Sequence, residues 1–435
     1  RPVVSSLEPM THAFPSSLTV TSLCLGLFAC AQPAAVCVDD TCPSGHACQD
    51  GACAPLSPPS ATGALGQHTS VAVHDDGRLL LATYDATYGN LVVASQAPDG
   101  GQVTRVVDGW TVLEHGLQDR DRGKWTGIDV GPAGDAHVIW YDADAGSVRY
   151  ARFGEANLDA AVEIEIVDGD GVADRGTHGS LAVGPDGVVH ATYRDESAHL
   201  LRYARRSVDG AWSSEIVPGC AGELDCPDSA EDYGEYASLV LVGGLPRIAF
   251  YDRSRGDLKL AQRDAAGSWA VSTLDGRDVE RDIDTGDVGR FAAAAVDAKQ
   301  RLGVAYYDAT HGTLRYIFAS GATPTPIVAD DGVYTDPRTG AARQHLVGQH
   351  AALTFDPRDV ALIVYLDAGN LGLKRARVMG DQVLDVAPLP GLRPGAFLSA
   401  ALDGDGRLVG AYGAWPEGDP GGTALATFVD EDGPL

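Results

Sequence analysis

The sequence predicts an all-β protein, a seven-bladed β-propeller of four-stranded antiparallel blades. Three observations predict this fold class: one stretch opening with Gly-x-His or Gly-x-aromatic recurs, it occurs seven times, and short apolar runs alternate with tight turns inside each copy. The seven copies begin at Gly66, Gly123, Gly176, Gly234, Gly289, Gly348 and Gly395. Units of this length cannot bury their own faces, so neighbours must stack. Four-stranded units that stack seven times close into a propeller.

The clearest copy shows how one unit is built. It starts at Gly289, continues through a small and apolar run to Val296, turns, and continues through a second run to Tyr307. An Asp then opens the next turn, and six copies have this Asp: Asp85, Asp142, Asp195, Asp252, Asp308 and Asp367. The steps between them are 57, 53, 57, 56 and 59 residues. We expect the carboxylate to accept backbone N–H groups of its own turn, which is a structural role.

The first copy can be divided into four strands. They are 69–73, 78–84, 91–96 and 102–107, separated by turns rich in Asp and Gly. The seventh copy departs from the pattern, because Gly413-Ala414-Trp415 stands where Tyr-x-Asp is expected and one strand candidate, 423–429, remains. We expect its fourth strand to be missing or to be supplied by residues 56–65.

A separate organisation is predicted before the propeller, which we place at residues 66–432. Residues 1–30 are interpreted as upstream sequence and a signal segment whose apolar core is Leu18 to Ala29. Leu27-Phe28-Ala29-Cys30 resembles a lipobox, which predicts lipidation at Cys30; an ordinary cleavage site at Ala29-Cys30-Ala31 is the alternative. The chain would then be an outer-membrane or cell-surface lipoprotein, or a secreted protein.

Cysteines follow the signal segment closely. Residues 31–53 form a Cys-rich module and 54–65 a Pro/Ser/Gly linker. The module contains Cys37, Cys42, Cys48 and Cys53. Two disulfides of open connectivity are expected, with a zinc site as the alternative. Cys220 and Cys226 bracket one loop of the repeat region and predict a local disulfide.

The formal charge of −28 bears on partners. A surface this acidic repels nucleic acid and anionic lipid and favours cations, neutral ligands or basic partners; solubility alone is the other interpretation. We therefore expect no nucleic-acid partner, membrane contact only through a lipid anchor, and a monomer that binds an extracellular ligand or protein.

The repeat resembles the sialidase-like, or BNR-like, bacterial propellers. Their copies read Ser-Leu-Ala-x-x-x-x-Gly and then Tyr-Tyr-Asp-x-x-x-Gly-x-Leu-x-Tyr; this chain has Ser180-Leu-Ala-Val, and its fifth copy has Tyr307-Asp308, Gly312 and Leu314-Arg-Tyr. The resemblance covers residues 66 to about 430 and implies the fold. Asp boxes of the form Ser-x-Asp-x-Gly-x-x-Trp are absent from the sequence, so sialidase chemistry is not implied.

The His or aromatic position of each copy is the main candidate site. It opens the innermost strand of a blade, so seven side chains should encircle one mouth of the central channel. His68, His178 and His350 could hold a Cu, Zn or Fe ion on the axis. The alternative is that they pack as aromatic rings do, beside the candidate ligand-binding residues Trp125, Tyr236, Phe291 and Phe397.

The loops between copies are long and acidic and share this face. Asp282, Asp284 and Asp287 resemble part of a calcium loop without its full ligand set. Many carboxylates could pair for glycoside cleavage, and none stands out. The sequence thus predicts an extracellular or cell-surface module that binds a carbohydrate, peptide or partner protein. The alternative is a metal-dependent secreted enzyme that acts on an extracellular polysaccharide or another secreted substrate.

Overall fold

The computed structural model describes two parts of the chain, which divides into the compact units Arg1–Leu56 and Ser57–Leu435. The described residues are 46–49, 52–55, 62–109, 111–113, 116–118, 120–160, 162–220, 231–278, 281–320, 324–391, 393–415 and 424–430. Within them, no helix is long and apolar enough to cross a membrane. The predicted signal segment, Cys30, Cys37 and Cys42 lie outside the described residues.

The first unit contains one described hairpin, in which β1 (His46–Gln49) pairs antiparallel with β2 (Ala52–Pro55). Its register places Cys48 opposite Cys53. The disulfide connectivity of the Cys-rich module stays a prediction.

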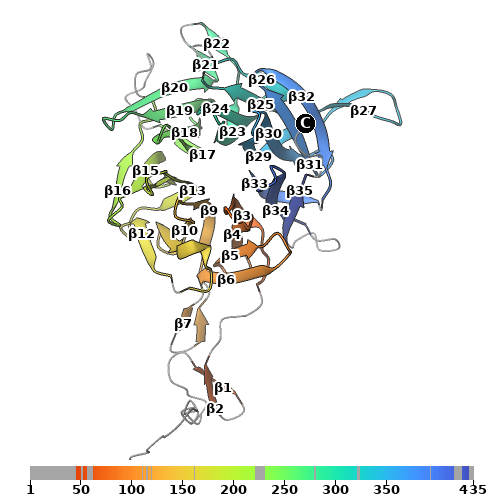
Figure 1. Cartoon of the computed structure of the whole chain (residues 1–435). Helices are drawn as coiled ribbons and strands as arrows, with labels where there is room; N and C mark the ends of the chain where they lie inside the picture. Colours follow the sequence, from red (N-terminus) through yellow and green to blue (C-terminus); the bar gives the residue numbers. More distant parts are fainter. Residues whose placement is uncertain are drawn as a thin grey trace, which may run out of the picture. The chain divides into compact units, whose positions relative to one another are not determined.

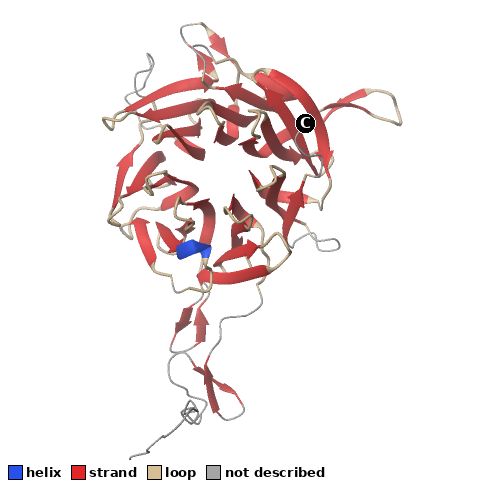
Figure 2. Cartoon of the chain, viewed as in Figure 1, coloured by secondary structure: helices blue, strands red, loops and turns tan. Residues whose placement is uncertain are grey.

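The second unit is a seven-bladed β-propeller, as predicted (Figure 1). Its blades follow one another around a central axis, and nearly all regular structure in the described ranges is strand (Figure 2). A short 3-10 helix, η1 (Gly154–Ala156), follows β11.

Each blade is an antiparallel sheet whose strands follow chain order from the axis outward. Blades one to three consist of β3 (Gln67–Val73), β4 (Leu79–Asp85), β5 (Asn90–Gln96) and β6 (Gln102–Asp108); β9 (Arg122–Val130), β10 (Ala136–Asp142), β11 (Ser147–Phe153) and β12 (Ile164–Asp168); β13 (Arg175–Val183), β14 (Val189–Asp195), β15 (Leu200–Arg206) and β16 (Trp212–Ile216). Blades four to six consist of β17 (Tyr233–Val242), β18 (Leu245–Asp252), β19 (Asp257–Arg263) and β20 (Trp269–Asp275); β23 (Val288–Val296), β24 (Leu302–Asp308), β25 (Thr313–Phe318) and β26 (Ile327–Asp330); β29 (Val347–Phe355), β30 (Ala361–Asp367), β31 (Gly372–Met379) and β32 (Gln382–Leu389).

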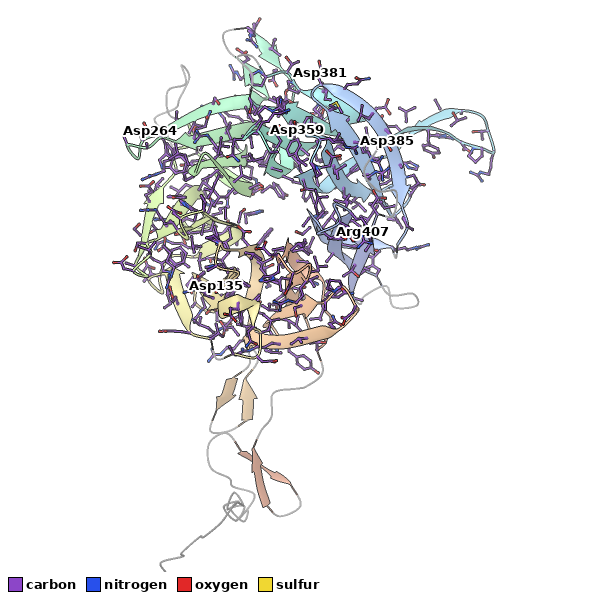
Figure 3. The ribbon with its side chains drawn as sticks, in the orientation of Figure 1. Asp135, Asp264, Asp359, Asp381, Asp385 and Arg407 are labelled. Carbon is purple, nitrogen blue, oxygen red and sulfur yellow. The ribbon has the colours of Figure 1, made fainter. Side chains whose placement is uncertain are left out.

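Some connections between blades carry additional two-stranded hairpins. Those among the described residues are β7 (Thr111–Leu113) with β8 (Gly116–Gln118), β21 (Arg277–Asp278) with β22 (Ile283–Asp284), and β27 (Val333–Thr335) with β28 (Ala342–Gln344). The turns that join the two outer strands of blades four and six lie at the outer edge of the ring, where Figure 3 labels Asp264 and Asp381.

The core lies between blades. Every residue of β10, β24 and β30 is buried, because neighbouring blades cover both faces of a blade. The inner strands carry small residues, as in the Ala292 to Ala295 run of β23, so that seven strands can surround one axis.

The seventh blade differs from the others. It has three described strands, β33 (Pro394–Leu402), β34 (Leu408–Ala414) and β35 (Ala424–Val429), and no fourth strand among the described residues. Ala64, on the segment expected to supply it, instead accepts a backbone hydrogen bond from Ala86 of blade one at 2.9 Å. Closure also involves Ser399, whose Oγ accepts the backbone N–H of Val71 at 3.1 Å.

The repeated Asp has the structural role expected of it. In all six copies its Oδ1 accepts a backbone N–H two or three residues further along the turn, for example from Ala198 to Asp195 at 2.9 Å and from His311 to Asp308 at 2.9 Å. These side chains are at most 3% exposed. Asp195 and Asp308 also pair with Arg202 at 2.8 Å and with Arg315 at 2.7 Å, which neutralises the buried charge.

Candidate functional site: the aromatic mouth of the channel

Seven aromatic side chains form a closed ring at one mouth of the channel; we call it the aromatic mouth. The members are His68, Trp125, His178, Tyr236, Phe291, His350 and Phe397, one from the inner strand of each blade. Neighbouring ring centroids lie between 4.1 and 5.7 Å apart, and the last contact, from Phe397 back to His68 at 4.1 Å, closes the circle. The structure therefore brings together all three predicted metal ligands and all four predicted ligand-binding aromatics.

The ring surrounds a cavity of about 180 Å³. Its lining consists of the seven rings and the residue after each, which is small in six blades. Those following residues are Thr69, Thr126, Gly179, Ala237, Ala292, Ala351 and Leu398. A cavity with this lining offers aromatic faces and edges, and the described part of the chain places no charged side chain on its wall.

A backbone bulge places each ring there. All seven residues have a left-handed backbone, with φ between 50° and 59°, and the pairing register shifts around them, as between Arg290 and Ala293 in β23. A side chain at such a φ costs about 1–2 kcal/mol. The Gly two residues earlier permits the bulge: a Cβ on Gly289, whose φ is 107°, would lie 2.8 Å from Cα of Leu258 in the preceding blade.

The histidines have a defined protonation state. Burial lowers the pKa of His68 and of His178 to about 3 and the pKa of His350 to about 4, so all three are neutral near pH 7. Nδ1 of His178 accepts the backbone N–H of Tyr236 at 3.0 Å, and Nδ1 of His350 accepts that of Phe397 at 3.4 Å. In these two neutral rings the proton is therefore on Nε2. Nδ1 of His68 is buried without a hydrogen-bond partner among the described residues.

This tautomer opposes the axial metal hypothesis. A histidine that binds a metal through Nε2 carries its proton on Nδ1 and donates it to an acceptor. In His178 and His350, Nδ1 is itself the acceptor. Across the described residues, no group of three or more His, Cys, Asp or Glu side chains is arranged to hold a metal ion. Binding of Cu, Zn or Fe stays a prediction, and the geometry supports the alternative in which the histidines pack as aromatic rings.

Charged groups surround the mouth behind the rings, and they are paired. Lys124 contacts Asp121 at 2.6 Å and lies over the Tyr84 ring, 5.3 Å from its centroid. Arg290 contacts Asp287 at 2.5 Å and lies over the Tyr251 ring at 5.5 Å.

The same carboxylates link neighbouring blades. The hydroxyls of Tyr84, Tyr141 and Tyr251 donate to Asp121, Asp174 and Asp287 of the next blade at 2.8, 2.6 and 2.8 Å. These carboxylates are therefore engaged in the fold.

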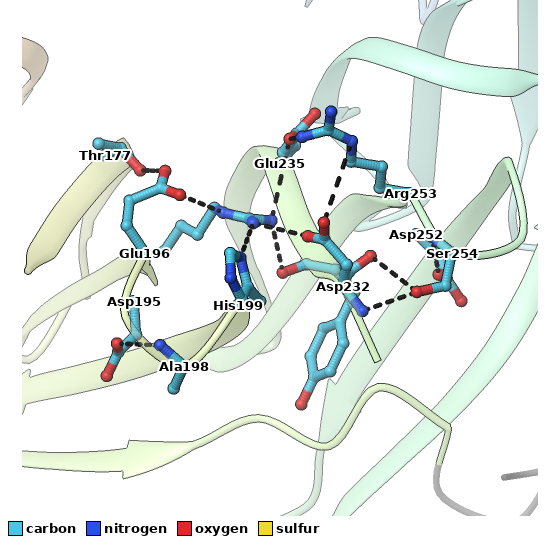
Figure 4. Close-up of polar contacts among 12 residues, drawn as sticks. Thr177, Asp195, Glu196, Ala198, His199, Asp232, Glu235, Asp252, Arg253 and Ser254 are labelled. Atoms are coloured by element: carbon cyan, nitrogen blue, oxygen red, sulfur yellow. Dashed lines mark hydrogen bonds and ion pairs between the residues drawn. The ribbon is translucent and has the colours of Figure 1, made fainter. Parts of the chain in front are cut away.

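In blade three, Arg194 of β14 stands where the other strands have this tyrosine. Figure 4 labels the carboxylates around it, Glu196, Asp232 and Glu235. Arg194 is 1% exposed; it donates to Asp232 at 2.6 Å and to Glu196 at 3.0 Å and lies 4.0 Å from Glu235. Arg253 pairs with Glu235 at 3.1 Å. Two guanidinium groups thus hold three carboxylates together, and this cluster has the composition of a structural ion network.

The predicted calcium ligands are not assembled into a site by the described residues. Asp282 and Asp284 are exposed, Oδ1 of Asp284 accepts the backbone N–H of Gly286 at 2.9 Å, and Asp287 is paired with Arg290. Calcium binding stays a prediction. The predicted bond between Cys220, which is 5% exposed, and Cys226 also stays a prediction, because Cys226 lies outside the described residues.

The opposite mouth of the channel has a different character. A cavity of about 630 Å³ lies between the far ends of β3, β9, β13 and β33, and Asp129 is among its lining residues. Both oxygens of Asp129 accept backbone N–H groups at 2.8 Å, from Val130 and from Val183 of the next blade. Desolvation raises the pKa of this carboxyl to about 6. Asp129 was not predicted from the sequence. Its only sequence signal is that it is a single acidic residue whose immediate neighbours are small or apolar.

The fold and the aromatic mouth define a propeller with a candidate binding cavity on its axis. No protein-family model and no curated protein sequence matches the chain. Among solved structures, it is similar to the polysaccharide lyase Uly1 (11% identity, 89% of this chain and 94% of that chain, TM-score 0.49). It is also similar to the Hadza microbial sialidase Hz136 (14% identity, 77% of this chain and 70% of that chain, TM-score 0.45). A third similar structure is the subtype N11 neuraminidase-like protein of A/flat-faced bat/Peru/033/2010 (11% identity, 93% of this chain and 98% of that chain, TM-score 0.42). Likenesses at these values do not carry a functional assignment.

Proposed function

We propose that the chain is an exported binding module that takes an extracellular ligand at the aromatic mouth. One observation carries the proposal: seven rings from seven blades line a single open cavity, and each is held at a strained backbone conformation. Strain of this kind persists where the surrounding structure over-determines it, and it gathers at ligand-binding positions.

The chemistry of the lining supports binding over catalysis. The rings supply apolar faces, and Nε2–H of His178 and of His350 supplies hydrogen-bond donors, while the carboxylates and guanidiniums nearby are engaged with one another. Carbohydrates, peptide side chains and partner proteins all present surfaces that pack on aromatic rings. A general acid or base works best with a pKa near the working pH, whereas burial lowers the pKa of the three histidines in the cavity to about 3 or 4, which makes them weak bases near pH 7.

The test is binding of the full chain to glycan and peptide arrays, repeated with Tyr236→Leu. The matched control is Tyr334→Leu, since Tyr334 is 38% exposed on the β27–β28 hairpin. We expect array binding to fall at least about tenfold in Tyr236→Leu and to be unchanged in Tyr334→Leu, with both variants folded by circular dichroism. Equal binding by the wild type and by Tyr236→Leu would show that the ligand is taken elsewhere.

A further inference from the structure

The seven rings of the aromatic mouth do not lie flat across the channel opening. Neighbouring planes are inclined by 35° to 74°. Seven planes that lay flat across the opening would be parallel, whereas seven upright planes differ by about 50° from one to the next in the tilted contacts that aromatic rings prefer. A ligand on the axis would therefore meet rings on every side.

The dimensions suit a cation held by the rings. A regular ring of seven with neighbouring centroids 4.1–5.7 Å apart would place the axis roughly 5 Å from each centroid, within the ~6 Å over which a cation is attracted to an aromatic ring. The circle is narrower than regular on either side of His68, where Trp125 and Phe397 lie 6.3 Å apart. Trp125, which has the ring type that attracts cations best, is a member. Its centroid lies 4.1 Å from that of His178 and 6.3 Å from that of Phe397.

The charges of the site decide which cation. The three histidines are neutral because burial lowers their pKa, so they do not repel a positive ligand. Of the nearby cations, Lys124 and Arg290 are paired with Asp121 and Asp287 and lie over other rings. Arg194 and Arg253 are paired with Asp232 and Glu235.

Among the described residues, no carboxylate lines the cavity, so a primary ammonium would lose its water without a charged partner in return. A methylated ammonium is weakly hydrated and loses less. The net charge of −28 raises the concentration of cations near the surface.

Resting on the proposed function, we propose that the rings turn their negatively charged faces toward the axis and that the aromatic mouth recognises a compact methylated ammonium group, either free or carried by a larger ligand. Aromatic cages that close around a quaternary ammonium use this combination of several rings and few charges.

The experiment is calorimetric titration of the full chain with choline and with 3,3-dimethyl-1-butanol, the neutral molecule of the same shape. We expect choline to bind at least about tenfold more tightly, since the two differ only in the charge that the rings attract. Trp125→Leu should weaken choline binding by about tenfold or more. Trp125→Phe, which keeps a ring and guards against misfolding as the explanation, should retain most of it.

His350→Phe separates two modes of recognition. It removes an N–H donor and adds a phenyl ring, which attracts cations, so choline affinity should rise, whereas a ligand held by hydrogen bonds from His350 would be lost. Equal affinity for choline and its neutral analogue, or no binding of either, would overturn the inference. If array ligands still respond to Tyr236→Leu in that case, the binding site stands and its ligand class is different. If they do not respond, the proposed function fails as well.

Discussion

Tyr306→Phe tests how the blades are joined. Tyr306 is fully buried in β24 of blade five, and its hydroxyl donates to Oδ2 of Asp275, the last residue of blade four, at 2.6 Å. Arg315 contacts the same oxygen at 2.9 Å. The equivalent bonds join Asp168 to Tyr193 at 2.6 Å and Asp330 to Tyr365 at 2.7 Å. Three blade boundaries therefore carry one carboxylate that is shared between two blades.

The magnitude follows from what the substitution leaves behind. A hydrogen bond to a charged group contributes about 1.5–3 kcal/mol to the free energy of unfolding. Asp275 keeps Arg315 and also accepts the backbone N–H of Gly276 at 3.0 Å, so the carboxylate is not left unpaired. We therefore expect Tyr306→Phe to lower the free energy of unfolding by about 2 kcal/mol.

The chain contains its own control for this reasoning. At the boundary between blades three and four, Val217 stands where the other boundary has the carboxylate of Asp275. The backbone N–H of Val217 donates to the carbonyl of Leu201, and Asp275 pairs in the same way with Leu258, the equivalent residue of the next blade. The partner in blade four is Phe250, which has no hydroxyl and is fully buried. No carboxylate of the described residues takes the place of Asp275 at this boundary, so Phe250→Tyr would bury a hydroxyl without that partner, at a cost of about 1–3 kcal/mol. The two opposite substitutions should therefore both destabilise.

The assay is urea unfolding followed by tryptophan fluorescence and by far-UV circular dichroism, with coincident transitions required before free energies are compared. A neutral Tyr306→Phe, or a Phe250→Tyr that raises stability, would refute the idea that shared buried carboxylates join the blades.

Three further outcomes are expected. Phe291→Gly should be more stable than Phe291→Ala by about 1 kcal/mol, because Gly removes the left-handed strain; this is the reverse of the usual order in strands. Ala295→Gly, in the same strand, should instead lose stability. Urea unfolding of the three variants measures both differences in stability. The depressed pKa of His178 means that the unfolded chain binds more protons between about pH 6.5 and pH 3, so stability should fall as the pH falls through this range; His178→Phe should flatten that dependence, and an unchanged slope would contradict it. The Asp129 carboxyl should titrate near pH 6 by carbon-13 NMR, and a midpoint near 4 would show that desolvation does not act on it as described.

The fold could be predicted from the sequence because the residues that begin strands and form turns recur at a regular spacing. Gly289 and its counterparts, the Asp turns and the alternating short runs recur in register, and a repeat that cannot bury itself alone leaves few architectures. The place of His68, His178 and His350 on one cavity followed from the same register.

Other features could not be predicted in the same way. The residue type does not determine the direction of a hydrogen bond. Whether Nδ1 of His178 donates or accepts depends on where the bulge places the backbone N–H of Tyr236. The raised pKa of Asp129 depends on how the folded blades bury its carboxyl, which the residue type alone does not show. The sequence does show that Val217 and Phe250 both depart from the repeat, which has Asp275 and Tyr306 at the equivalent positions. That the two departures compensate each other becomes clear only when the contacts between strands of adjacent blades are known.

The bulge at the aromatic mouth has a consequence for how the lining of this cavity could vary. The left-handed turn is permitted by the Gly two residues earlier and by the register of the strand, and it is the same for an imidazole, an indole, a phenol and a phenyl ring. The backbone conformation at these seven positions therefore does not depend on which ring is present. Exchange of one aromatic residue for another can change the chemistry of the cavity one position at a time, while the bulge and the blades behind it keep their conformation.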